Sequence, residues 1–190
     1  MRRQGLLAQS IVAVVLVMTA TGLVGGPALA ESTASATPSA SSRPGSGLPQ
    51  VGDEVAYISE SGGTIATVTV THVEQPWTGY GEYYTPDSGT EYVAFVIELT
   101  HQGTRGDLIV QPEDFRLQDA DGFLLSRSWA NAADNAELKP SSDPVAIAPG
   151  ATGRVVVVFQ VLQGIELSQL LWQPEYDRLI TLADLHGRGG

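Results

Sequence analysis

The chain has 190 residues, with 10 basic and 21 acidic side chains, a net charge of −11 at pH 7 and no cysteine. The lack of cysteine excludes disulfide bonds, thiolate metal sites and a thiol nucleophile. The acidic balance argues against binding to nucleic acid or to anionic lipid, because like charges repel. This charge permits a basic partner or a divalent cation but does not imply either.

Residues 1–30 predict a cleaved secretory signal. Two arginines precede an uncharged and mostly apolar run at 6–24, and Ala28-Leu29-Ala30 has the small residues that a signal peptidase selects. The alternative is an uncleaved membrane anchor, because the apolar run is just long enough to span a bilayer. Both interpretations place the rest of the chain outside the cytoplasm.

Residues 31–50 are almost all Ser, Thr, Ala, Pro and Gly. Such a segment has too little apolar surface to offset the entropy lost on ordering, so we predict a disordered linker. The domain is predicted at 51–185, and 186–190 is predicted to be a disordered tail. No second domain is indicated.

The domain shows the period-two alternation of β-strands. At 64–73, Val68 and Val70 are expected on one face together with a partly buried His72. Four consecutive valines within 153–161 predict a strand buried on both faces, and therefore central in its sheet. Further strands are predicted at 91–100, 115–117, 123–125, 170–172 and 179–182.

Turn residues separate these strands, and helical periodicity is scarce. Asp121-Gly122 predicts a tight hairpin, because glycine readily adopts a positive φ. Only 130–138 shows a weak helical pattern. Many short strands with almost no helix predict an all-β fold, an immunoglobulin-like antiparallel β-sandwich.

Several short motifs follow one another in a fixed order along the domain. They are VGD at 51–53, YVAF at 92–95, EDFRLQD at 113–119, DG at 121–122, PG at 149–150 and GRVVVVF at 153–159. In this order they resemble the bacterial extracellular immunoglobulin-like domains of unknown function that include the mycobacterial immunoprotective extracellular antigen. The resemblance covers roughly 51–182. It implies a secreted or surface-attached sandwich and brings no catalytic residues. Many such proteins are lipid-anchored at a cysteine, which this chain lacks.

The sequence contains no motif for catalysis, for a cofactor or for zinc. Nucleophile-elbow and phosphate-loop motifs are absent, and His72, His101 and His186 do not have zinc-ligand spacing. An acidic cluster surrounds the predicted hairpin, but it lacks the ligand pattern of an EF-hand loop, so a solvated turn is favoured over a calcium site. The cluster consists of Glu113, Asp114, Asp119 and Asp121.

The segment 75–90 concentrates aromatic side chains among glycines and prolines. Its candidate binding residues are Trp77, Tyr80, Tyr83 and Tyr84. Large amphipathic rings on a loop make good recognition surface, although such rings also cover the end of a sandwich. Trp129 and Trp172 are predicted to pack inside.

Our first hypothesis is therefore a secreted, non-enzymatic module that binds an extracellular protein or a cell-envelope ligand through this loop. The alternatives are a membrane-tethered structural or accessory envelope protein and a secreted hydrolase.

Overall fold

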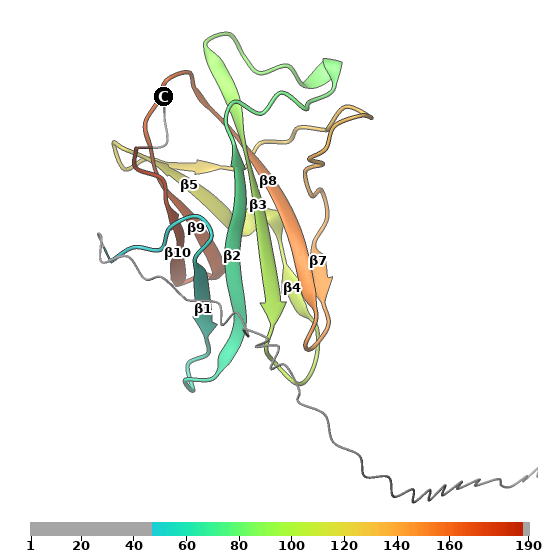
Figure 1. Ribbon diagram of the computed structural model, residues 1–190, viewed down its shortest axis with the longest axis vertical. Helices are drawn as coiled ribbons and strands as arrows, with labels where there is room; N and C mark the ends of the chain where they lie inside the picture. Colours follow the sequence, from blue (N-terminus) through green and yellow to red (C-terminus); the bar gives the residue numbers. More distant parts are fainter. Residues whose placement is uncertain (1–46, 188–190) are drawn as a thin grey trace, which may run out of the picture. The chain divides into compact units, whose positions relative to one another are not determined.

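The long predicted strands lie side by side in the computed structural model, which describes residues 47–187 (Figure 1). One antiparallel sheet contains β1 (Glu54–Ile58), β2 (Thr64–Glu74), β3 (Thr90–His101) and β8 (Thr152–Leu162), in the order β1-β2-β3-β8. β-branched residues favour these strands because their side chains suit a pleated, half-buried surface. The strands predicted at 64–73 and 91–100 are confirmed.

A second antiparallel sheet covers the first. It contains β5 (Phe115–Asp119), β6 (Leu124–Ser126), β9 (Leu167–Glu175) and β10 (Arg178–Asp184), in the order β10-β9-β5-β6. The predicted hairpin joins β5 to β6, with Gly122 at a φ of 87°. The remaining elements are the strand pair β4 (Leu108–Val110) and β7 (Val145–Ile147) and the 3₁₀ turns η1 (Glu82–Tyr84) and η2 (Pro112–Asp114).

The hydrophobic core lies between the two sheets. The rings of Phe95 and Phe159 meet edge to face at 5.8 Å, and Tyr57 meets Trp172 in the same way at 5.1 Å. All four side chains belong to the main cluster of buried residues, and Trp172 packs inside as predicted. The predicted fold class is confirmed as an antiparallel β-sandwich.

The position predicted for the valine-rich strand is wrong. Val155 to Phe159 are buried on both faces, yet β8 is the last strand of its sheet. Its outer edge is covered by irregular chain, because Ser128 N donates to Val158 O at 2.7 Å and Ser141 N donates to Val156 O at 2.8 Å. The face of β8 that is turned away from the main core is buried as well, because Val158 packs in a second cluster with Trp77, Tyr92 and Ala130. Burial on both faces therefore does not require a neighbouring strand on each side.

The predicted facing of His72 is also wrong. The pairing of β2 with β3 shifts register between Val70 and His72, which is a β-bulge. The bulge reverses the alternation, so that His72 is exposed and Val73 packs against the core.

The weak helical pattern at 130–138 does not form a helix.

At the N-terminal side, the domain begins before residue 51. Asp184 N donates to Pro49 O at 2.7 Å, and Gln50 forms a parallel bridge with Asp184. The predicted signal, the linker up to residue 46 and residues 188–190 of the tail lie outside the described residues.

Candidate functional site

The predicted aromatic segment packs over the outer face of β3 and β8. Together, residues 75–92 and 128–138 form what we call the aromatic lobe. Its centre is a second buried cluster formed by Trp77, Tyr92, Ala94, Ala130 and Val158. Tyr92 and Ala94 alternate along β3 with residues of the main core, so this cluster lies on the opposite face of the sheet.

Three rings in the lobe meet edge to face. Trp77 lies 6.1 Å from Tyr80 and 6.0 Å from Tyr92, and the two tyrosines are 5.5 Å apart. Burial, together with the nearby charge of Asp87, raises the pKa of Tyr92. Edge-to-face packing adds to the stabilisation that burial of the rings provides.

Backbone hydrogen bonds join the two segments of the lobe. Gly81 N donates to Asn131 O at 2.8 Å, and Ala133 N donates to Gly79 O at 2.8 Å. Residues 131–133 are therefore held extended along the aromatic segment. This pairing explains why 130–138 has no helix.

The structure divides the four predicted binding residues by exposure. Trp77 is only 1% exposed and belongs to the buried centre of the lobe. Tyr80 and Tyr84 are half-buried, and the Tyr84 hydroxyl accepts a hydrogen bond from Asn131 Nδ2 at 2.7 Å. Tyr83 is 88% exposed on η1, so of the four it has the most accessible ring.

Trp129 is a surface aromatic of the same lobe, although the sequence predicted that it packs inside. It is 69% exposed, and the guanidinium of Arg127 lies 3.8 Å from its ring centroid. Its neighbour Ala130 is buried in the lobe. An extended strand would place the neighbouring residues Trp129 and Ala130 on opposite faces, which could have predicted that Trp129 is exposed. The weak helical pattern at 130–138 argued against an extended strand here.

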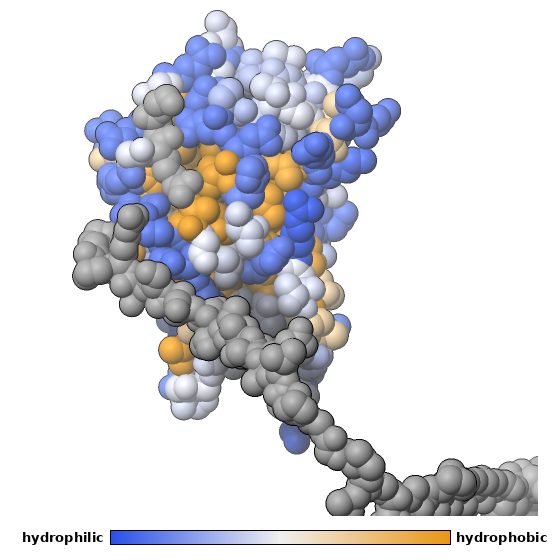
Figure 2. All heavy atoms as spheres, viewed as in Figure 1, coloured by the Kyte–Doolittle hydropathy of each residue, from blue (hydrophilic) through white to orange (hydrophobic). Residues whose placement is uncertain are grey.

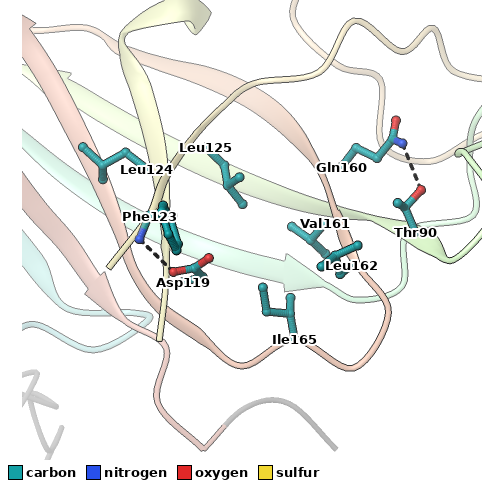
Figure 3. Close-up of a pocket in the computed structure, with 9 residues that line it drawn as sticks. All are labelled: Thr90, Asp119, Phe123, Leu124, Leu125, Gln160, Val161, Leu162 and Ile165. Atoms are coloured by element: carbon teal, nitrogen blue, oxygen red, sulfur yellow. Dashed lines mark hydrogen bonds between the residues drawn. The ribbon is translucent and has the colours of Figure 1, made fainter. Parts of the chain in front are cut away.

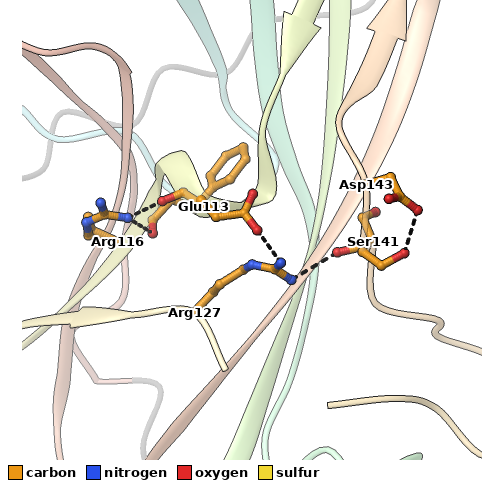
Figure 4. Close-up of polar contacts among 7 residues, drawn as sticks. Glu113, Arg116, Arg127, Ser141 and Asp143 are labelled. Carbon is orange, nitrogen blue, oxygen red and sulfur yellow. Dashed lines mark hydrogen bonds and ion pairs between the residues drawn. The ribbon is translucent and has the colours of Figure 1, made fainter. Parts of the chain in front are cut away.

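The Arg127 guanidinium ties three segments together (Figure 4). It pairs with Glu113 Oε1 on η2 and donates to Ser141 O at 3.1 Å. Only 6% of the Arg127 side chain is exposed. The guanidinium is therefore largely removed from water. In such a buried ion pair, the planar guanidinium of arginine is favoured over the ammonium of lysine.

The predicted acidic cluster does not converge on one point. Glu113 pairs with Arg127, and Asp119 Oδ1 accepts a hydrogen bond from Phe123 N at 2.8 Å. Burial raises the pKa of Asp114, and Asp121 is exposed on the turn. Within residues 47–187, no group of three or more His, Asp or Glu side chains is placed to hold a metal ion.

The three histidines lie in separate places. His101 is buried, with Nδ1 3.1 Å from Ile147 O, and His72 is exposed at the bulge. His186 Nδ1 lies 2.6 Å from Asp184 Oδ1, and hydrogen bonds from His186 lower the pKa of that aspartate.

An open, mainly apolar groove of about 440 Å³ lies between β6 and the end of β8 (Figure 3). Phe123 and Leu125 are on one side, and Val161, Leu162 and Ile165 are on the other. The face drawn in Figure 2 shows an apolar area surrounded by hydrophilic residues. The groove was not predicted from the sequence, because it depends on how the two sheets meet.

Two solved structures of bacterial proteins have a similar fold. The secreted protein MPT63 of Mycobacterium tuberculosis superposes with a TM-score of 0.51 at 14% identity, covering 73% of this chain and 99% of MPT63. YcdA of Bacillus subtilis, a proposed lipoprotein, superposes with a TM-score of 0.52 at 18% identity, covering 73% of this chain but only 39% of YcdA. At these identities the likeness is one of fold, which does not itself define function.

No protein-family model and no curated protein matches the sequence. Among the residues that the structure describes, no helix is long and apolar enough to cross a membrane.

Proposed function

We propose that the protein is a non-enzymatic extracellular module that binds a protein or cell-envelope partner through the exposed rings of the aromatic lobe. The supporting observation is the 88% exposure of Tyr83 on a turn that is fixed from within. Tyr84 N donates to Gly81 O at 2.9 Å, and Gly81 in turn donates to Asn131. The backbone of this turn is already ordered, so covering the Tyr83 ring with a partner costs little additional conformational entropy.

Trp129 provides a second exposed ring on the same lobe. Arg127 stacks on it while bonded to Glu113 and Ser141, so the stacked pair is restrained before any partner arrives. Tryptophan, tyrosine and arginine are the side chains that most often dominate binding energy at interfaces. Trp77, Tyr80 and Tyr84 act as the framework that holds the exposed rings in place.

An extracellular or envelope location is supported by the predicted signal and by the descriptions of the two similar structures, one secreted and one a proposed lipoprotein. N-terminal sequencing of the protein from the producing cell tests whether it is released. A start near Glu31 is expected. An intact N-terminus in the membrane fraction would instead support the tethered alternative.

Cross-linking on the producing cell tests the binding surface. We expect the native protein to enrich one partner that Tyr83→Ala and Trp129→Ala no longer enrich, although both variants remain folded. Tyr176→Ala is the matched control, because that ring is 98% exposed on the turn between β9 and β10. Identical partner profiles for native protein and both lobe variants would contradict the proposal.

A further inference from the structure

The groove occupies a gap in the seam between the two sheets. β8 and β6 are each the last strand of their sheet, and the chain after β6 crosses to β8 at Ser128. Ser128 closes one end of the seam by donating to Val158 O and by accepting, through Oγ, a hydrogen bond from Gln160 N at 2.8 Å. The other end is closed where Ala120 N donates to Glu166 O at 3.0 Å. Between these two closures the edges of the sheets stay apart.

Large apolar side chains are exposed along this gap. Phe123 is 68% exposed, Leu162 is 62% exposed and Leu124 is 51% exposed, and all three line the groove. Single exposed apolar residues are normal on protein surfaces, but a contiguous group that borders a concave site marks a binding surface.

The outer edge of β6 has unpaired backbone groups. Asp119 N donates to Phe123 O at 3.1 Å, and Leu117 pairs with Leu125 at the next hydrogen-bonded position of the ladder. Hydrogen-bonding direction alternates along an antiparallel strand, so the N–H and C=O groups of Leu124 and Ser126 point away from β5. An exposed edge of this kind is a template for a further strand.

The edge of β8 differs, because irregular chain already covers it. Ser128 and Ser141 bond to the outward backbone groups of Val156, Val158 and Gln160. A strand that enters the groove would therefore pair with β6 and place side chains against the apolar end of β8.

The acidic residues in and around the groove, which we call the acidic rim, indicate that such a strand would have basic residues at its ends. Among the described residues that line the groove, Asp119 is the only charged one and none is basic. Asp121 and Glu166 are exposed on the two turns that flank the groove, and Asp87 holds the Gln160 side chain through a 2.9 Å hydrogen bond. Arg127 follows β6, but its guanidinium is turned to Glu113. A second copy of this chain would bring the same acidic rim, so like charges disfavour self-association here.

We propose that the groove is a peptide-binding site, in which an extended segment of a partner protein, alternately apolar and flanked by basic residues, adds to β6 as a further strand. Backbone hydrogen bonds to Leu124 and Ser126 hold the segment, its apolar side chains cover Phe123 and Leu162, and its basic ends face the acidic rim. This is the strand-addition mode of peptide recognition. It is independent of the aromatic lobe, so Tyr83→Ala should leave it unchanged.

The test is a binding titration of the protein, purified from cells that produce it, with a short synthetic peptide of alternating valine and threonine that has lysine at both ends. A matched peptide carries glutamate in place of lysine. We expect the lysine peptide to bind at least about tenfold more tightly, with a preference that shrinks as salt is added. Amide hydrogen exchange should slow at Leu124 and Ser126 when this peptide is bound.

Two variants separate the backbone and charge contributions. Leu124→Pro removes an outward N–H from an edge strand, where proline is tolerated, and should weaken lysine-peptide binding by about tenfold. Asp119→Asn keeps an acceptor for Phe123 N but removes the charge, and should reduce the preference for the lysine peptide. The second variant keeps the test decisive if Leu124→Pro fails to fold.

Three results would overturn the proposal. The first is equal affinity for the two peptides, and the second is unchanged affinity in both variants. The third is a dimer in sedimentation that Leu124→Pro abolishes, since this would assign the edge to a second copy of the chain.

Discussion

The hydroxyl of Tyr57 on β1 donates a hydrogen bond of 2.6 Å to Glu175 Oε1 on β9, and so links the two sheets across the core. Burial raises the pKa of Tyr57 to about 12, and the hydrogen bond to Glu175 and the charge of that carboxylate add to the effect. Arg178, whose guanidinium lies 5.5 Å from the ring centroid, acts in the opposite direction.

This link predicts a loss of stability in alkaline solution. The unfolded phenol loses its proton near pH 10, whereas the folded one keeps it until about pH 12. The contribution of the raised pKa is therefore complete below pH 10 and is lost as the pH rises through about 12. In urea titrations across this window, the free energy of unfolding should fall more steeply for the native protein than for Tyr57→Phe.

The matched control for this prediction is Tyr176→Phe, which removes the same hydroxyl from a ring that is 98% exposed. It should keep the native slope. If the native protein and Tyr57→Phe lose stability in parallel, the link does not govern the alkaline transition.

Gly103 lies against the imidazole ring of the buried His101, where a larger residue would not fit. A Cβ at this position would lie 2.4 Å from His101 Nε2, while the other ring nitrogen is fixed against Ile147 O. Gly103→Ala should therefore lower the free energy of unfolding by about 1–3 kcal/mol, the usual cost of overpacking. Gly63→Ala is the control, because its new Cβ meets nothing nearer than Ser59 Oγ at 3.5 Å. Equal melting temperatures for the two variants would show that the histidine moves freely.

Arg127 should not be replaceable by lysine. An ammonium group cannot pair with Glu113, donate to Ser141 and stack on Trp129 at once. We expect Arg127→Lys to cost about 1–2 kcal/mol in chemical denaturation. Arg154→Lys, the same change at an exposed position on β8, should cost almost nothing. A similar loss of stability in both variants would mean that the cost comes from a general effect of replacing arginine by lysine and not from the three contacts of Arg127.

Trp77 and Tyr83 should behave in opposite ways although only six positions separate them. Trp77→Ala empties the centre of the aromatic lobe and should lower the free energy of unfolding by about 3–5 kcal/mol. Tyr83→Ala removes a ring that is 88% exposed and should change it by less than about 0.5 kcal/mol. Calorimetric melting of both variants checks this. A tolerated Trp77→Ala would show that the lobe is not a second core.

Alternation was enough to predict the sandwich and its long strands. In β2 and β3, the pattern of side chains on each strand is set by the sheet to which it belongs, so local sequence carries the information. Gly122 likewise marks its own turn. The short strands β4 and β7 were not predicted, whereas β6, which also has three residues, was predicted beside the Asp121-Gly122 hairpin.

The errors arise where distant segments decide the outcome. The backbone edge of β8 is covered by Ser128 and Ser141, whose approach no local pattern reveals. The exposure of Tyr83 and the burial of Trp77 depend in the same way on the segment at 131–133. The groove is formed by the ends of strands that lie far apart in the chain, so its residues carry no common motif.

The bulge in β2 gives this strand two opposite phases. Before the bulge, the residues that must remain apolar are at even positions, Ala66, Val68 and Val70; after it, the constraint passes to an odd position, Val73. Polar substitutions at His72 should therefore be as well tolerated as those at Thr69 on the other side of the bulge. Deletion of Thr71 would remove the extra residue of the bulge, so that Val70 and Val73 would fall into one continuous alternation facing the core, while His72 would stay opposite Val96 and point away from it.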